Sequence, residues 1–357
     1  MFNPSRLTLA RKRRRFSKKE LAEAVGVTPH SILRYEKGEI RPTDEVVARL
    51  SGSLKFSIDF FFGADLDEIH EGAASFRSLS SITAKDRDAA LAAGSLAYML
   101  SDWVGERFDL PKPDLLDLSD DTPEIAARSL REKWGLGERP IKNMVHLLEA
   151  KGVRLFSMAE NTMAVDAFSV WRRETPYVFL NTMKTAEHGR YDAAHELGHL
   201  VLHREGGPKG RAAEHEANQF AAAFLLPAAD VMATLPRVHT LNQVIEAKKR
   251  WAVSVMALLH RLRRLEIMSD WQYRMFCIDA TGLGYRRAEP FGVARERSVV
   301  WQKVLTTLWG ERVTKAEIAR DLNMPSNEVE NLLFGLAGGM PGEPAPEMKP
   351  PPLRLIS

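Results

Sequence analysis

Apolar residues recur at helical spacing along most of the chain, and the pattern is clearest near its start. It predicts helices over residues 17–25, 28–36, 44–54 and 57–62. Ser17 and Thr28 are suited to cap the first two of these helices, and Pro29 suits the first turn of the second. Gly26 supplies the turn between them. Residues 1–64 are therefore expected to form a separate bundle of about five helices.

Residues 65–120 are expected to be a connector that contains one long helix, from Thr83 to about Phe108. One side of this helix is apolar along its length: Leu91, Leu96, Met99, Leu100, Trp103 and Val104. Packing against the rest of the chain and a contact between two copies in a homodimer both explain this stripe. The sequence leaves the two explanations open.

Residues 121–235 are expected to form one domain, in which short strands lie beside buried helices. A capped helix is expected to run from Thr122 or Pro123 to Trp134. Strand-like stretches bounded by Gly, Asn and Pro follow at residues 152–156, 163–165, 167–171 and 177–180. They are expected to form a small antiparallel sheet beside a buried helix at residues 192–204.

After Pro227 the pattern is helical again. Residues 236–337 are expected to be a helical C-terminal region, with Ser254 capping one helix, and residues 338–357 a Gly- and Pro-rich tail. The basic residues near Ser254 are compatible with nucleic-acid contacts, but packing against the preceding domain is the favoured interpretation. The predicted fold class is mainly α with a small antiparallel sheet (α+β).

Composition narrows the class of protein. The 357 residues, 45% hydrophobic and 27% charged, are typical of a globular chain with two or three domains. The single cysteine, Cys277, excludes an internal disulfide and indicates a cytoplasmic protein. The longest apolar stretch, residues 89–100, is too short to cross a bilayer, so no membrane partner is expected.

Positive charge is concentrated at the N-terminus, although the net charge of the chain is only +3. The basic residues before the first acid are Arg6, Arg11, Lys12, Arg13, Arg14, Arg15, Lys18 and Lys19. Such a run usually forms a solvated face or a disordered arm. Here a helix, a turn and a second helix follow, and this second helix would present side chains to the major groove. The residues expected to contact double-stranded DNA are Lys18, Thr28, His30, Ser31 and Arg34.

The strongest chemical signal is the sequence His-Glu-Leu-Gly-His at residues 195–199. Residues four apart on a helix share a face, so His195 and His199 can direct ring nitrogens at one metal ion. Glu196 lies beside them, where it can take a proton from water. This arrangement is typical of metallopeptidases, in which the ion acidifies water and polarises a peptide carbonyl. His203 continues the stripe too far along the helix for the same ion, so a structural role is expected.

A second amphipathic helix, over residues 214–227, offers a third ligand. On a helical wheel Glu214 borders the apolar face, whereas His215 and Glu216 lie farther round and are expected in solvent. Glu214 is therefore the expected ligand. Asn218, one turn on, is expected to support the site by hydrogen-bonding a metal-bound histidine.

These motifs resemble the ImmA/IrrE family of zinc-dependent metallopeptidases: HELGH, then Glu-x-x-Ala-Asn-x-Phe-Ala and Leu-Leu-Pro. The similarity spans about residues 5–290, and the flanks are similar to members that carry an N-terminal XRE-type helix-turn-helix. The resemblance implies a zincin-like domain in which His195, His199 and Glu214 hold one zinc ion and Glu196 is the general base. It also implies that the substrate is a repressor or another DNA-bound regulatory protein.

One position departs from the XRE pattern. The first helix of the motif often begins with a glutamine that supports recognition, and Lys18 stands there instead. Lys18 is expected to contact a phosphate instead. Such a contact would add affinity for the DNA backbone and contribute less to sequence specificity.

Together these features predict a cytoplasmic DNA-binding regulator with a metal-dependent endopeptidase domain, holding zinc or another divalent ion. Two alternatives remain. In one, the protein is a transcription factor whose metal site is structural or sensory; in the other, it is an antitoxin-like protein whose peptidase domain only binds a partner. The enzyme is favoured, because a structural site does not need Glu196 and usually fills all four ligand positions with protein side chains.

Overall fold

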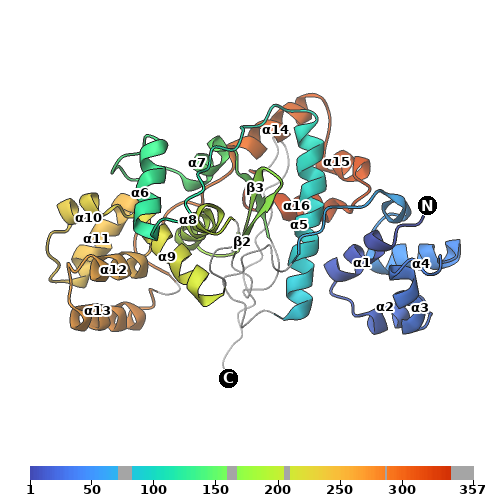
Figure 1. Ribbon diagram of the computed structural model, residues 1–357, viewed down its shortest axis with the longest axis horizontal. Helices are drawn as coiled ribbons and strands as arrows, with labels where there is room; N and C mark the ends of the chain where they lie inside the picture. Colours follow the sequence, from blue (N-terminus) through green and yellow to red (C-terminus); the bar gives the residue numbers. More distant parts are fainter. Residues whose placement is uncertain (71–82, 159–166, 205–209, 286–287, 339–357) are drawn as a thin grey trace, which may run out of the picture.

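The N-terminal bundle forms one end of the molecule in the computed structural model, which describes residues 1–70, 83–158, 167–204, 210–285 and 288–338 (Figure 1). Its helices are α1 (Pro4–Arg13), α2 (Lys18–Val25), α3 (Pro29–Glu36), α4 (Asp44–Leu54) and the 3₁₀ helix η1 (Ile58–Phe62). The predicted caps are confirmed. Ser17 and Thr28 accept hydrogen bonds from backbone N–H groups of the next turn, and Gly26 takes the left-handed conformation that ends α2.

The basic N-terminal run is neither an arm nor a solvated face, because half of it lies in α1 and most of it is paired with acids of this chain. Glu328, whose side chain has no exposed surface, accepts from Arg13 at 2.7 Å and from Arg14 at 2.6 Å. Other pairs of the run are Arg11 and Lys18 with Glu36, Lys12 with Asp88 and Arg15 with Asp86. Much of this charge therefore neutralises acids within the protein.

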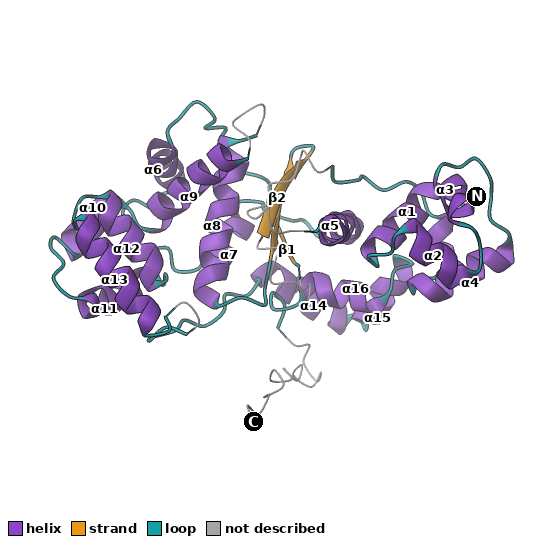
Figure 2. Cartoon of the chain, turned by 90° about the horizontal axis from the view of Figure 1, so that it is seen from below, coloured by secondary structure: helices purple, strands orange, loops and turns teal. Residues whose placement is uncertain are grey.

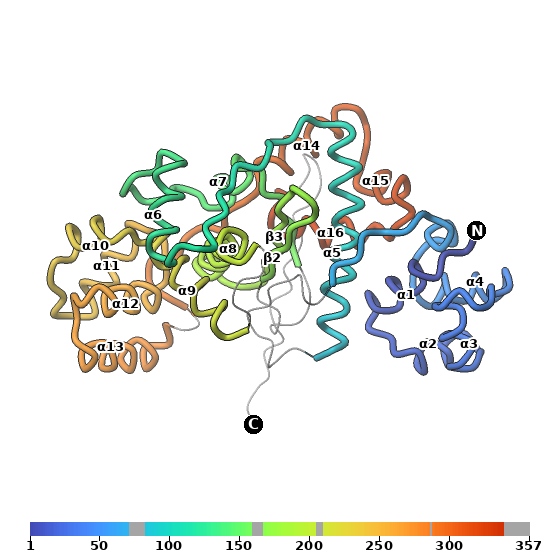
Figure 3. Tube along the Cα trace, in the orientation of Figure 1, coloured from blue at the N-terminus to red at the C-terminus, as the bar shows by residue number. Residues whose placement is uncertain are grey.

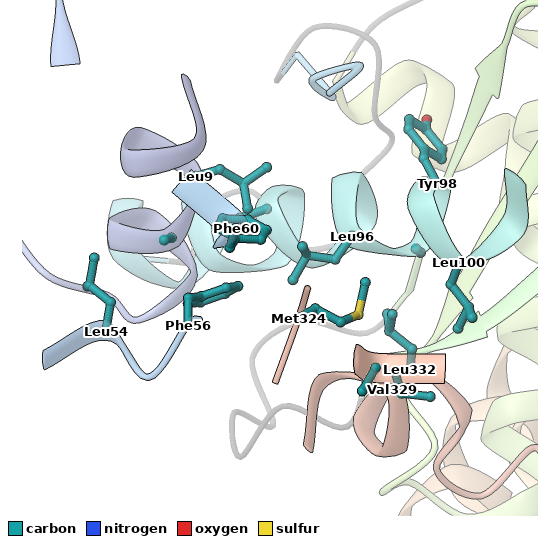
Figure 4. Packing of buried hydrophobic residues seen from close by; sticks show 14 of the residues in the cluster. Leu9, Leu54, Phe56, Phe60, Leu96, Tyr98, Leu100, Met324, Val329 and Leu332 are labelled. Carbon is teal, nitrogen blue, oxygen red and sulfur yellow. The ribbon is translucent and has the colours of Figure 1, made fainter. Parts of the chain in front are cut away.

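The long connector helix, α5 (Ala84–Gly105), lies between the bundle and the rest of the chain (Figure 2). Its apolar stripe is buried by both neighbours: Leu96 and Leu100 belong to the same core as Leu9 and Phe60 of the bundle (Figure 4). This burial favours packing within the chain as the explanation of the stripe.

The last three helices of the described residues return to α5 after the chain has passed through the far end of the molecule (Figure 3). They are α14 (Val299–Gly310), α15 (Lys315–Asp321) and α16 (Ser326–Leu333). Met324, Val329 and Leu332 join the core shared by α5 and the bundle (Figure 4). Three segments far apart in the sequence thus bury their apolar surface together.

A small sheet forms the centre of the molecule, and with it the predicted fold class is confirmed: mainly helical with few strands. The strands are β1 (Arg154–Ser157), β2 (Ala167–Arg172) and β3 (Thr175–Leu180), in the order β1-β3-β2. The sheet is mixed and not purely antiparallel as expected, because β1 pairs parallel to β3. β2 and β3 form a hairpin, and β1 enters on the other edge of β3. The strand expected at residues 163–165 lies outside the described residues.

The two faces of the sheet pack against different parts of the chain. Successive side chains of a strand point to opposite faces. Phe168 and Phe179 therefore pack in the core shared with α5 and the bundle. Ala167 and Val178, each one residue away, pack in a second core with α8 (Ala186–Leu202). Three more helices contribute to this second core: α6 (Pro123–Lys133), α7 (Met144–Ala150) and α9 (Arg211–Leu225).

Four further helices extend the second core to the end of the molecule opposite the bundle (Figure 1). They are α10 (Ala228–Thr234), α11 (Leu241–Trp251), α12 (Val255–Arg264), which Ser254 caps as predicted, and α13 (Asp270–Gly282). Four of their basic residues pair with acids: Arg261 with Glu124, Lys248 with Glu289, Arg250 with Asp230 and Arg263 with Asp270. This favours packing over nucleic-acid binding for this region. Within the described ranges, no helix combines the length and apolar character needed to cross a membrane.

The pairing of Glu328 with Arg13 and Arg14 gives a prediction about stability. Glu328→Ala would leave two guanidinium groups facing a buried site without their carboxylate. Removing one partner of a buried ion pair costs about 3–5 kcal/mol. We therefore expect a loss of that size in the free energy of unfolding measured by urea titration. Glu330→Ala, an exposed change on the same helix, is the control and should have little effect; an equal loss in both variants would contradict the prediction.

Candidate metal centre

The central helix α8 is held in the core by apolar flanks, which bury the polar residues between them. Thr185 caps the helix, and its side chain accepts a hydrogen bond from the backbone of His188. The flanks Ala193, Ala194, Leu197, Leu200 and Val201 are each at most 2% exposed. His195 and Glu196 have no exposed surface, and His199 is 4% exposed. The polar side chains must therefore find partners inside the protein.

Helix α9 crosses α8 at very short range because of a glycine inside the His-Glu-Leu-Gly-His sequence. A Cβ atom on Gly198 would lie 3.1 Å from Cδ1 of Phe220 and 3.2 Å from Cα of Ala217. Both distances are shorter than ordinary van der Waals contact between carbon atoms. The absence of a side chain at Gly198 thus lets the backbones approach, and it brings Glu214, at the start of α9, next to the two histidines.

Three donor atoms meet at this crossing. Nε2 of His195 lies 3.1 Å from Nε2 of His199, and the carboxylate oxygens of Glu214 lie 3.3 and 3.4 Å from these two nitrogens. In a tetrahedral zinc site with bonds of about 2.0–2.2 Å, neighbouring ligand atoms are about 3.3 Å apart. The spacing and the chemistry of the two imidazoles and one carboxylate therefore fit a zinc ion, and these three residues can form a metal-binding group.

The electrostatics of the group favour the protonation states that bind a cation. Burial alone would raise the pKa of Glu214, but hydrogen bonds and charge from His195 and His199 lower that pKa to about 2. Burial lowers the pKa of His199, against the opposing effect of Glu214. Near neutral pH the group therefore offers a carboxylate and a neutral imidazole, the forms in which these side chains bind metals.

The glutamate beside the first histidine is held by a residue that sequence analysis missed. Oγ of Ser169, on β2, donates to Oε2 of Glu196 at 2.7 Å, and Ser169 is 3% exposed. Ser169 shares the sheet face of Ala167, which packs toward α8. A signal existed in the sequence, since Ser169 is a small polar residue in an otherwise apolar stretch beside the expected helix. The pairing itself required the tertiary structure.

Asn218 does not contact a histidine ring in the way expected. Its Nδ2 donates to the backbone oxygen of Glu214 at 2.7 Å, one turn earlier on the same helix. The backbone oxygen of Asn218 accepts from the hydroxyl of Tyr191 at 3.0 Å, which ties α9 to α8. Asn218 thus supports the backbone of the expected ligand. Tyr177 points to the other side of the sheet, where its hydroxyl donates to Ser101 of α5.

The neighbours of the three donors differ from expectation in one respect. His215 is exposed as predicted. Glu216 is not simply solvated, because its Oε2 lies 2.9 Å from Nε2 of His203. Nδ1 of His203 in turn lies 3.0 Å from Nδ1 of His199. The expected ligand His199 is therefore connected to the surface of α9 by two hydrogen bonds.

The expected DNA-contacting residues lie on α2, on α3 and at the N-cap of α3, at the end of the molecule farthest from α10–α13 (Figure 2). His30 is exposed, and Arg34 is 41% exposed with Glu39 3.4 Å away. Thr28 and Ser31 also serve the fold, since Thr28 caps α3 and its hydroxyl bonds that of Ser31. Lys18 is 42% exposed and lies 3.7 Å from Glu36, whose carboxylate also binds Arg11.

These features define the class of the protein: a helix-turn-helix protein joined to a metallopeptidase-type domain. Comparison with family models agrees. Residues 7–61 match a family described as helix-turn-helix, and residues 148–263 match a peptidase family described as the IrrE N-terminal-like domain. The chain therefore combines an XRE-type helix-turn-helix domain with an IrrE-like peptidase domain, and the resemblance seen in the sequence is confirmed. Among curated proteins, none matches the chain.

The close crossing at Gly198 can be tested with a matched pair of substitutions in α8. Alanine normally stabilises a helix by about 1 kcal/mol relative to glycine. Gly189→Ala should show such a gain, because the new Cβ would have its nearest neighbour at 3.9 Å. Gly198→Ala should instead lose about 1–3 kcal/mol through overpacking. Thermal and urea unfolding would measure both, and a gain at Gly198 equal to that at Gly189 would contradict the close-crossing argument.

Proposed function

We propose that this protein is a transcriptional regulator whose peptidase domain uses zinc to cleave a regulatory protein. The observation that carries the proposal is the convergence of His195, His199 and Glu214 at the crossing of α8 and α9. The Glu196 carboxylate, bonded by Ser169, adds the acid–base group that a structural metal site would not need. The match of residues 148–263 to a peptidase family supports the same conclusion.

In this proposal His195, His199 and Glu214 hold one zinc ion, or another divalent ion, per chain. A bound zinc ion lowers the pKa of water and polarises a carbonyl group. Glu196 takes a proton from the attacking water and delivers it to the departing amine. Ser169 donates to Oε2 of Glu196 and keeps the carboxylate in one orientation, so that its second oxygen serves the proton transfer.

An extended substrate segment would bind along β2. This strand forms an edge of the described sheet, and it lies next to α8 through the bonds of Ser169 and Trp171 to that helix. Strand addition to such an edge satisfies the backbone groups of a peptide without requiring a particular sequence. The substrate is proposed to be a repressor or another DNA-bound regulator.

A second candidate function is favoured by one observation: His195 and Glu196 have no exposed surface. A centre enclosed to this degree suits a structural or sensory metal site, in which no bond is cut. In the enzyme, by contrast, the protein must open to admit a peptide. The two functions make different demands on Glu196, and this difference decides between them.

The helix-turn-helix domain is proposed to bind double-stranded DNA through α3. Most of the basic residues of α1, and those directly after it, pair with acids of the same chain. Phosphate contacts would therefore come from exposed basic side chains of α2 and α3, Lys18 and Arg34 among them. A homodimer would present two such heads to the two half-sites of an operator.

The enzyme and the sensor are separated by substitutions in the centre. Glu214→Gln and His195→Ala should lose most of the zinc measured by elemental analysis. Glu196→Gln should keep the zinc, yet lower the cleavage of a DNA-bound regulatory protein by ~10²–10⁴ because the general base is lost. DNA binding should survive in all three variants. If Glu196→Gln regulates its promoter normally while His195→Ala does not, the metal is structural or sensory and the peptidase proposal is wrong.

DNA binding can be tested by titration at several salt concentrations. The affinity should fall with salt, since each phosphate contact releases counterions. Arg34→Ala should relax the sequence preference at a cost of about 1–3 kcal/mol, whereas Lys18→Ala should weaken all sequences alike and lower the salt slope by about 1. Lys303→Ala, an exposed change on α14, is the charge-matched control. Equal behaviour of the three variants would point to protein contacts instead.

A further inference from the structure

A short series of hydrogen bonds connects the metal centre to the surface of α9. It runs from Nδ1 of His199 to Nδ1 of His203 over 3.0 Å, and from Nε2 of His203 to Oε2 of Glu216 over 2.9 Å. The side chains of His199 and His203 are only 3% and 8% exposed, so their partners are protein groups and not bulk water. Glu216, at 37%, is the exposed end of the series.

The chemistry of these groups permits one arrangement of protons in a metal-loaded centre. A neutral imidazole has one N–H donor and one lone pair, and an ionised carboxylate can only accept. Nε2 of His203 must therefore donate to Glu216, which leaves a lone pair on its Nδ1. That lone pair accepts from Nδ1–H of His199. Nε2 of His199, which lies 3.4 Å from Glu214, is left with its lone pair directed at the metal centre.

The opposite arrangement is unfavourable at both ends. If Nδ1 of His203 donated, its Nε2 lone pair would face the Glu216 carboxylate, and two acceptors would oppose each other at 2.9 Å. His199 would then carry its proton on Nε2, the atom that has to bind the ion. Two imidazoles facing each other would accept either arrangement, so the carboxylate of Glu216 decides between them.

We propose that Glu216 and His203 are positioning residues that fix the ring tautomer of His199 and thereby hold its Nε2 lone pair ready for zinc. The inference rests on the proposed metal centre and extends it to two residues outside the ligand set. His203 is suited to this role by its place at the end of α8. Its backbone N–H donates to the carbonyl oxygen of His199. The two residues are therefore one helical turn apart, and their side chains lie on the same face of the helix.

The test combines a tautomer measurement with a metal affinity. Long-range ¹H–¹⁵N spectra of histidine-labelled full-length protein identify the protonated nitrogen of each ring. Competition with a chelator gives the zinc dissociation constant. Glu216→Leu removes the acceptor at similar size, Glu216→Gln keeps an acceptor oxygen, and His215→Leu changes the exposed neighbour as a matched control. The spectra are recorded with and without zinc.

In the zinc-loaded wild type, the expected pattern is a proton on Nδ1 of His199 and on Nε2 of His203. Glu216→Leu should mix the tautomers of His203 and raise the zinc dissociation constant about 10–100-fold, as loss of a hydrogen-bond partner of a metal-binding histidine does. Glu216→Gln should restore much of the affinity, and His215→Leu should match the wild type.

Two outcomes would overturn the inference: a wild-type His203 protonated on Nδ1, or unchanged zinc affinity in Glu216→Leu. A wild-type protein that binds no zinc would instead refute the proposed metal centre. In that case the spectra of the metal-free wild type and of Glu216→Leu still show whether Glu216 sets the proton position of His203, so the two failures are distinguishable.

Discussion

The structure of the centre depends on the contact between α8 and α9 at Gly198. Two helices with ordinary side chains at their contact lie 8–10 Å apart, and Glu214 would then not reach both histidines. With no Cβ at Gly198 and only a methyl group at Ala217, the backbones approach until Phe220 lies against the glycine itself. The contact is apolar, so the hydrophobic effect brings His195, His199 and Glu214 together. This explains how three polar donors can be assembled inside a core that otherwise excludes them.

The sheet has a corresponding role between the two halves of the molecule. Because side chains alternate along each strand, Phe168 packs toward α5 and the DNA-binding bundle while its neighbour Ser169 bonds Glu196 on the other face. The bundle is fixed to this layer by a shared core and by the Glu328 ion pairs from α16. One face of β2 thus packs toward the DNA-binding bundle, and the other face carries Ser169, which orients the proposed base Glu196.

Local periodicity was sufficient to predict what lies on a single element. The caps Ser17 and Thr28, the shared face of His195 and His199, and the place of Glu214 at the border of an apolar face all follow from helical spacing. Contacts between residues far apart in the sequence could not be predicted in this way. Ser169 and Glu196 are 27 positions apart and on different elements, and Arg14 and Glu328 are 314 apart. A basic run looks the same in sequence whether it faces phosphates or buried carboxylates. The parallel pairing of β1 could not be predicted either, because the apolar pattern of a strand does not show which edge of a sheet it joins.

The apolar core around the three donors also determines how substitutions in the centre are to be interpreted. In metal sites without a preformed core, binding and folding are one event, and loss of a ligand unfolds the domain. Here the apolar flanks of α8, the Phe220–Phe224 stack of α9 and one face of the sheet form a core that includes none of the three donor side chains. The carboxylate of Glu214 is already stabilised by the two histidines, which hold its pKa at about 2. The arrangement of the three donors therefore does not depend on an ion, and we expect a substitution of one donor to change metal affinity far more than it changes the fold.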